Sequence, residues 1–276
     1  MNPVRDARSL LFVPGHRPER FAKAEATAAD LVCIDLEDAV PPVERVDARR
    51  AVLEHLSALP AGHRTGVRVS RWASTDGLRD VLALVDAAAQ PAFVMLAKAD
   101  SAEALRLLAA HFPGTVLIAL IESPRGVAAA GDIATAHPQV QALMLGGVDL
   151  AAELGASFGW DALLHARGAL ANAAAAAGIA CIDVPWLDVA DDAGLAAETR
   201  RVAGLGFSAK SCIHPQQVAA VHAALAPTAA ELDRARRVVA AVGDAGLDAA
   251  AVLVEGRLVD RPVVLAALRL LARAGR

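Results

Sequence analysis

The stretch LVCIDLEDAV, residues 31–40, begins as a buried strand and ends in three carboxylates. Four apolar residues lead directly into Asp35, Glu37 and Asp38. A buried carboxylate is costly unless it is paired, hydrogen-bonded or bound to a cation. The stretch therefore predicts a strand whose carboxyl end meets polar partners.

Seven other runs of apolar residues along the chain also have the character of strands. The segments between the β-like runs are rich in Ala, Leu and Arg, with apolar residues three and four positions apart, which indicates helices. Eight strands alternating with helices favour a closed (β/α)8 TIM barrel, an α/β fold, over an open doubly wound sheet. The predicted strands are 9–15, 30–38, 65–70, 92–98, 115–122, 140–149, 179–185 and 207–215.

The chain continues beyond a complete barrel. We expect a barrel catalytic domain over residues 1–225 and a C-terminal helical extension over 226–276. The extension is predicted to form a helix, then a hairpin or loop, then a final helix. It is expected to act as a lid on the barrel or to contact a neighbouring subunit.

Nearly every predicted strand ends in polar residues. In a (β/α)8 barrel these ends gather at one face, where the active sites of this fold are built. Because eight segments place polar groups there independently, their agreement is stronger evidence than any single motif. Besides the carboxylates of 31–40, the strand ends carry Arg68, Lys98, Glu122, Asp149, Asp183, Lys210 and His214.

Glu122 and Asp149 are predicted to end adjacent strands, about 5 Å apart. Two ionised carboxylates this close repel, so either one holds a proton or a cation lies between them. Mg²⁺ suits the second case, because it takes oxygen ligands and typically binds one or two carboxylates and several waters. Glu37 and Asp38 are then expected to accept hydrogen bonds from those waters. The alternative is a structural ring of salt bridges with Arg68 and Lys98.

Four basic residues at the strand ends are candidates for substrate binding. The Arg68 fork suits a substrate carboxylate or a developing oxyanion, although a salt bridge to Glu37 explains it equally well. Lys98 and Lys210 are expected to contact anionic substrate groups, with a Schiff base as the weaker alternative. His214 is either a substrate-binding residue or a structural one.

The composition excludes some functions. A net charge of −4 provides no basic footprint for nucleic acid. No run of about 18 strongly apolar residues predicts a membrane span. The N-terminus shows no signal peptide, and Cys33, Cys181 and Cys212 each lie in an apolar run. Free buried thiols are typical of a reducing compartment, so we expect a cytoplasmic protein.

Several motifs, in order, resemble a known family. They are RSLLFVPGHRPERFAKA, ADLVCIDLEDAVPP, VRVS, LAKADSAEAL, LIALIESPRGV, LMLGGVDLAAELG and CIHPQQV. Over about residues 8–270 the chain resembles the citrate lyase β-subunit-like proteins of the HpcH/HpaI aldolase/citrate lyase family. The resemblance implies a carbon–carbon lyase that cleaves a β-hydroxy-acyl thioester, of the citramalyl-CoA, malyl-CoA or citryl type, into a 2-oxo acid and an acyl thioester. Coenzyme A is then part of the substrate.

The resemblance also implies roles for individual residues. Glu122 and Asp149 would hold Mg²⁺, with Mn²⁺ as the alternative ion, and Glu37 and Asp38 would form the acidic shell around it. Arg68 would hold the substrate carboxylate or the enolate oxygen. Relatives often form trimers in which a C-terminal aspartate enters the neighbour's site. Asp260 in GRLVDRP matches that aspartate, and a helix N-cap is the other interpretation.

The chain departs from the family pattern at Ala97, Ser70, Ser123 and Ala209, which puts the substrate in doubt. Two other functions therefore stay open. One is a metal-dependent aldolase acting on free hydroxy-oxo acids. The other is the β subunit of an acyl-carrier-protein-dependent citrate lyase complex, without activity of its own.

Overall fold

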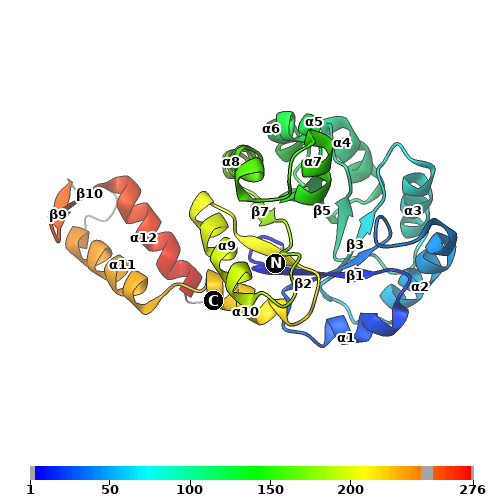
Figure 1. Ribbon diagram of the computed structural model, residues 1–276, viewed down its shortest axis with the longest axis horizontal. Helices are drawn as coiled ribbons and strands as arrows, with labels where there is room; N and C mark the ends of the chain where they lie inside the picture. Colours follow the sequence, from blue (N-terminus) through cyan, green and yellow to red (C-terminus); the bar gives the residue numbers. More distant parts are fainter. Residues whose placement is uncertain (1–3, 244–250, 275–276) are drawn as a thin grey trace. The chain divides into compact units, whose positions relative to one another are not determined.

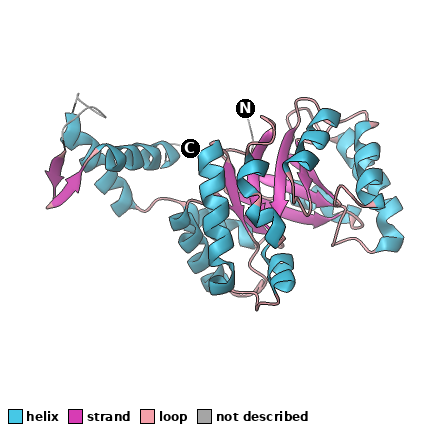
Figure 2. Cartoon of the chain, turned by 90° about the horizontal axis from the view of Figure 1, so that it is seen from above, coloured by secondary structure: helices cyan, strands magenta, loops and turns pink. Residues whose placement is uncertain are grey.

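The computed structural model describes residues 4–243 and 251–274, which form two compact units, Met1–Leu225 and Ala226–Arg276. In the first unit eight parallel strands close into a barrel in sequence order, which confirms the predicted (β/α)8 fold. Figure 2 shows the strands enclosed by helices. The strands are β1 Ser9–Pro14, β2 Leu31–Asp35, β3 Thr65–Val69, β4 Phe93–Leu96, β5 Val116–Ile121, β6 Val140–Leu145, β7 Ala180–Asp183 and β8 Ala209–Cys212.

The helices of the first unit follow the strands, as Figure 1 shows. Short 3-10 turns, Pro18–Arg20 and Pro42–Glu44, precede the first two helices. The helices are α1 Phe21–Glu25, α2 Arg45–Ala58, α3 Thr75–Val85, α4 Ala102–His111, α5 Pro124–Ala128, α6 Ala130–Ala134, α7 Gly147–Leu154, α8 Trp160–Ala177, α9 Asp192–Leu205 and α10 Gln217–Leu225.

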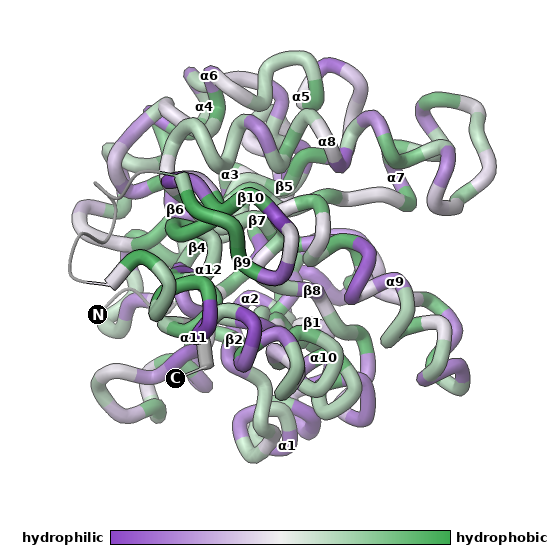
Figure 3. Tube along the Cα trace, turned by 90° about the vertical axis from the view of Figure 1, so that its left-hand side faces the viewer, coloured by the Kyte–Doolittle hydropathy of each residue, from purple (hydrophilic) through white to green (hydrophobic). Residues whose placement is uncertain are grey.

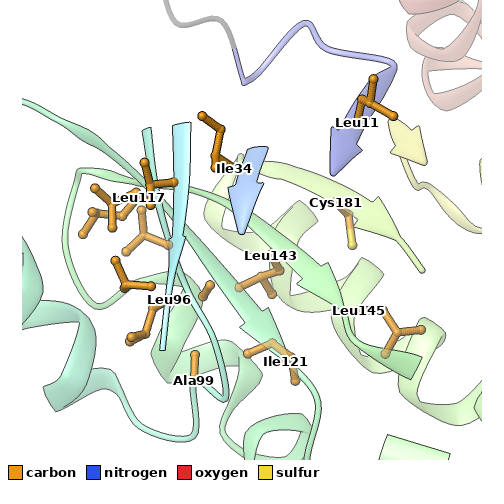
Figure 4. Packing of buried hydrophobic residues seen from close by; sticks show 14 of the residues in the cluster. Leu11, Ile34, Leu96, Ala99, Leu117, Ile121, Leu143, Leu145 and Cys181 are labelled. Carbon is orange, nitrogen blue, oxygen red and sulfur yellow. The ribbon is translucent and has the colours of Figure 1, made fainter. Parts of the chain in front are cut away.

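Strand alternation divides the core into two layers. Side chains pointing into the barrel, such as Leu10, Cys33 and Phe93, form an inner cluster. Their strand neighbours Leu11 and Ile34 point outward and pack under the helices in a larger outer cluster. Figure 4 shows part of this outer layer. Because successive side chains of a strand face opposite sides, a residue's place in the strand decides which layer it enters.

All eight predicted strands are present, but each is shorter than predicted. The largest difference is in the predicted strand 140–149, because β6 ends at Leu145 and α7 begins at Gly147. A Cβ on Gly146 would lie 2.5 Å from the Cβ of Glu122, so only glycine lets the chain turn this close to β5. Lys98 and Glu122 therefore lie just after their strands and Asp149 lies in α7, whereas Asp35 and Arg68 remain within β2 and β3.

The second unit is a helical hairpin with a small two-stranded sheet. It comprises α11 Ala229–Val242, β9 Val252–Val254, β10 Arg257–Val259 and α12 Arg261–Ala274. Thr228 and Glu231 form a capping box at the start of α11. Val238, Val242, Val259 and Val264 belong to a core of its own. No helix in the described parts of the chain is long and apolar enough to cross a bilayer.

Candidate active site

Asp35 holds Arg68 in place at the mouth of the barrel. The two residues are paired in the β2–β3 register, and both side chains lie on the inner side of the barrel. Arg68 Nε and Nη2 donate to the two carboxylate oxygens of Asp35, each over 2.6 Å. The same carboxylate accepts the backbone N–H groups of Glu37 and Ala39. Asp35 thus orients both the arginine and the loop that carries the other acids.

Glu37 joins Arg68 to Lys98. Its Oε1 accepts a hydrogen bond from Lys98 Nζ, and its Oε2 lies 3.4 Å from Arg68 Nη1 without accepting a hydrogen bond. Glu37 is only 5% exposed, and this burial raises its pKa. Asp38 is half exposed, with Oδ2 3.2 Å from Lys98 Nζ. One buried carboxylate oxygen is therefore still without a donor.

Lys98 contributes through its backbone as well as its side chain. Its φ of 51° lies in the left-handed region, which is uncommon for a residue with a Cβ. In this conformation its N–H donates to Glu122 Oε1 over 2.6 Å, while Nζ reaches 3.9 Å from Asp149 Oδ1. Such strained backbone positions are concentrated at functional sites.

Glu122 follows β5 and is almost completely buried, with 3% exposure. Burial, together with the negative charge of Glu37, raises the pKa of Glu122 to about 8. Asp149, by contrast, is 44% exposed at the side chain. It lies in the first turn of α7 and not at a strand end, which corrects the sequence-based placement. Both carboxylates nevertheless line one cavity of about 190 Å³, together with Arg68.

The charges of this group fit a divalent cation. We call the residues that meet here the mouth cluster; its five carboxylates face two cationic side chains, so negative charge is in excess. An Mg²⁺ ion bound by Glu122 and Asp149 would neutralise the excess, and its waters would supply donors to the free oxygen of Glu37. Among residues 4–243 and 251–274 no three His, Cys, Asp or Glu side chains form a preformed metal site. Two carboxylates with waters and substrate are therefore the set that fits. The mouth cluster comprises Asp35, Glu37, Asp38, Arg68, Lys98, Glu122 and Asp149.

Lys210 does not join this cluster, contrary to the expectation from the sequence. It is fully buried on the outer side of the barrel, where Nζ lies 2.7 Å from Asp183 Oδ2 and 2.8 Å from Glu198 Oε1. Arg167 completes the group, with Nε 2.9 Å from Asp183 Oδ1 and Nη2 3.2 Å from Glu198 Oε2. We call these four residues the outer network. In β8, Ala209 faces the lumen, so its neighbour Lys210 must face the helices.

The last two predicted site residues lie elsewhere. His214 is exposed and lines a separate cavity of about 320 Å³ with Arg20 and Lys23. Asp260 lies in the second unit, where Oδ1 accepts the backbone N–H of Val263 over 3.4 Å. This contact supports the N-cap interpretation of Asp260.

Two residues of the mouth were not singled out as partners of Arg68. Asp35 takes the place that was expected for Glu37, and its alternation with Cys33 was the available signal. The ring of Phe12 lies 5.2 Å from the Arg68 guanidinium carbon. No motif marks Phe12, because its role depends on the closure of the barrel.

Comparisons with known proteins agree with this architecture. Residues 8–215 match the family described as HpcH/HpaI aldolase/citrate lyase. A citrate lyase subunit beta-like protein of Mycobacterium tuberculosis is 41% identical over 96% of this chain and 94% of its own length. A (3S)-malyl-CoA thioesterase of Cereibacter sphaeroides is 34% identical over 97% of this chain and 94% of its own.

A solved structure extends the likeness to three dimensions. Protein CitE from M. tuberculosis, in complex with magnesium, acetoacetate and coenzyme A, superposes with a TM-score of 0.86. It is 38% identical, and the match covers 99% of this chain and all of that one. The family model, the relatives and the acid-rich barrel mouth lead to one conclusion: the chain belongs to the HpcH/HpaI aldolase/citrate lyase family.

Proposed function

We propose that this protein is a Mg²⁺-dependent carbon–carbon lyase that cleaves a β-hydroxy-acyl thioester into a 2-oxo acid and an acyl thioester. The observation that carries the proposal is the cavity at the barrel mouth, in which Glu122, Asp149 and Arg68 meet. The relatives support it, because their names include citrate lyase subunits and a malyl-CoA enzyme, and one neighbour was solved with magnesium and coenzyme A.

The metal site is assigned to Glu122 and Asp149, with Mn²⁺ as the alternative ion. A bound Mg²⁺ supplies Lewis-acid stabilisation of the oxygens of the hydroxy acid and of the 2-oxo acid formed from it. Glu122 is held for this role by the Lys98 N–H. Asp149 is accessible from solvent, so water can occupy the remaining positions around the ion.

Binding of the substrate carboxylate and removal of the hydroxyl proton are assigned to the other residues of the mouth cluster. Asp35 occupies two edges of the Arg68 guanidinium, which leaves Nη1 to hold the carboxylate or the enolate oxygen. Glu37 is the base that accepts the hydroxyl proton, because its raised pKa favours proton uptake. Lys98 holds Glu37 Oε1 in position, and Asp38 lies 3.2 Å from the same ammonium group.

The coenzyme A part of the substrate is assigned to the neighbouring cavity lined by Arg20, Lys23 and His214. These side chains offer two cations and an imidazole to an anionic chain. Lys98 is the mouth residue that would face the thioester side. This assignment retains His214 as a substrate-binding residue and omits Lys210, whose charge is already paired.

We further propose a cytoplasmic homotrimer in which Asp260 of one protomer enters the site of the next as an acid or base. The exposed apolar tips of the hairpin support contact with a neighbour, since Leu253 and Leu258 are 74% and 61% exposed. Figure 3 shows β9 and β10 in the hydrophobic colours. Three buried cysteines without disulfides support a reducing compartment.

Turnover of the purified protein tests the reaction. Citramalyl-CoA, malyl-CoA and citryl-CoA are each incubated with Mg²⁺ and then with EDTA, while the 2-oxo acid and the free thiol of coenzyme A are measured separately. We expect metal-dependent release of the 2-oxo acid without free thiol. Free thiol with an intact hydroxy acid would instead show a thioesterase and contradict the proposal.

The two rival functions give different results in the same assay. An aldolase on free hydroxy-oxo acids would release the 2-oxo acid from the unesterified substrate, and coenzyme A would have no saturable effect. A subunit that requires an acyl carrier protein would turn over none of the three thioesters until that carrier is added. Either result would replace the stand-alone lyase.

A further inference from the structure

A third cavity, of about 410 Å³, is lined by residues of α8 and α9 and of the loops next to them. Figure 1 shows these two helices, which precede and follow β7 in the chain. Phe158, Trp160, Leu163 and Trp186 give it an aromatic and apolar wall, and Arg167 and Arg201 also line it. Its lining shares no residue with the cavity of the mouth cluster. The volume falls in the range of small-molecule sites.

Two side chains that line this cavity each carry a buried donor without a hydrogen-bond acceptor. The side chain of Arg167 is 1% exposed; Nε and Nη2 are bound to the outer network, but Nη1 has no hydrogen-bond partner. The indole Nε1 of Trp186 is buried and also has none. Since an indole N–H and a guanidinium can only donate, both atoms need an acceptor. Leaving such donors unpaired is costly, and a ligand that carries acceptor oxygens would satisfy them.

The rim of the cavity adds positive charge. The guanidinium carbon of Arg201 lies 3.7 Å from the centre of the Trp160 ring, and that of Arg167 lies 4.6 Å from it. Arg201 is exposed, and no carboxylate in the described part of the chain forms an ion pair with it. It is therefore an ordered cation, held by an aromatic face, whose N–H groups remain available to an anion.

The acids that line the cavity do not cancel this charge. Glu198 is bound to Lys210 and Arg167 of the outer network. Asp188 accepts the backbone N–H of Ala190 over 3.0 Å and forms no ion pair with Arg201 in the described part of the chain. The outer network itself contains two cations and two anions. The charge of Arg201 is thus left for an incoming group.

We propose that this cavity binds a small aromatic carboxylate. Its ring packs against Trp160, Trp186 and Phe158, and its carboxylate accepts hydrogen bonds from Arg167 Nη1 and Trp186 Nε1. Arg201 closes the rim over the charge. This ligand is distinct from the aliphatic acyl thioester proposed for the barrel mouth, so the site adds a second binding function to the protein.

The wall of the cavity also lies against the start of α7, the helix that carries Asp149. A Cβ on Gly147 would lie 2.7 Å from Leu163 Cδ1 and 3.4 Å from Phe158 Cε2, and Gly147 is two residues before Asp149. Leu163 and Phe158 therefore pack beside the start of α7.

Calorimetric titration with phenylacetate tests the site, with the full-length protein in EDTA. Arg201→Gln is compared with Arg200→Gln, which removes the neighbouring exposed arginine of the same helix and serves as the matched control. We expect saturable binding to the unmodified protein, about tenfold weaker binding to Arg201→Gln, and unchanged binding to Arg200→Gln. Trp186→Phe, which keeps a ring but removes the donor, should also weaken binding.

Three results would overturn the proposal. They are the absence of saturable phenylacetate binding, equal losses in the two arginine variants, and binding that disappears in Glu122→Gln, which would place the anion at the barrel mouth. Phenylacetamide, the neutral analogue, should bind more weakly than phenylacetate.

Discussion

The mouth cluster and the outer network are both clusters of charged side chains built around barrel strands, yet they differ in charge balance. In the outer network Arg167 and Lys210 face Asp183 and Glu198, and the four ion pairs are 3.2 Å or shorter. The mouth cluster has five carboxylates against two cations. It also contains a carboxyl with a pKa near 8 and a buried oxygen without a donor.

The difference teaches how to separate a structural charge cluster from a functional one. A balanced network keeps its charges paired, so it needs no counter-ion and serves to join β7, β8, α8 and α9; Arg167 Nη1 is its one buried donor without an acceptor among the described residues. An unbalanced cluster bears a desolvation cost that its own residues do not offset, which is expected where a cation or substrate completes the set. Four experiments test this contrast between the balanced outer network and the unbalanced mouth cluster.

The largest effect is expected for Glu122→Gln. The amide keeps the shape and can still accept the Lys98 N–H, but it loses the charge that holds the metal. Activity should fall by about 10³-fold or more, since Lewis-acid stabilisation contributes several kcal/mol. Steady-state turnover and Mg²⁺ titration measure this. Full activity with unchanged Mg²⁺ affinity would remove Glu122 from the metal site.

Lys210→Met tests the opposite side of the comparison. Removing the lysine leaves Asp183 and Glu198 with Arg167 as the one remaining cation of the network, so one buried negative charge is in excess and the free energy of unfolding should fall by about 3–5 kcal/mol. Turnover per folded molecule at low temperature should be retained. Denaturant titration and activity are measured beside Lys98→Met, for which we expect lost activity and a smaller stability change. A Lys210 variant that is stable but inactive would show that Lys210 takes part in catalysis or substrate binding.

Asp260→Asn asks whether the mouth cluster is complete within one chain. Asparagine is as good an N-cap as aspartate, so the stability of α12 should be retained. If the carboxylate serves a neighbouring site as an acid or base, turnover should fall by about 10²-fold. Asp260→Ala would in addition cost about 1 kcal/mol of stability. Unchanged turnover in Asp260→Asn would leave the N-cap as the role of this residue.

The smallest effect is the pH dependence of Mg²⁺ binding. Because the pKa of Glu122 is raised to about 8, this carboxyl is protonated below that pH in the metal-free protein. Mg²⁺ must displace the proton, so its affinity should rise by up to about tenfold per pH unit as pH approaches 8, and then level off. Calorimetry in buffers of different ionisation enthalpy detects the released proton. A constant affinity between pH 6 and pH 8 would show that Glu122 is already ionised.

The eight strands and the family were predictable because they depend on local patterns. Runs of apolar residues that end in charged ones repeat eight times, and LVCIDLEDAV and LMLGGVDLAAELG are specific motifs. The pairing of Arg68 with Asp35 was less predictable. Several acids lie within reach of an arginine fork, and only the β2–β3 register selects Asp35 over Glu37.

The sequence by itself determined the alternation of strands and helices and the acidic character of the barrel mouth. Both depend on residues that are close together in the chain: the spacing of apolar residues and the polar residues that follow each run. The tertiary structure decided which charges enter the lumen. Strand alternation would place Phe207 and Ala209 on the same side, yet Phe207 packs in the outer layer and Ala209 faces inward. The strand β8 begins only at Ala209, so alternation counted from Ala209 places Lys210 on the outer side. One position along a strand reverses the side, and only barrel closure defines where each strand begins.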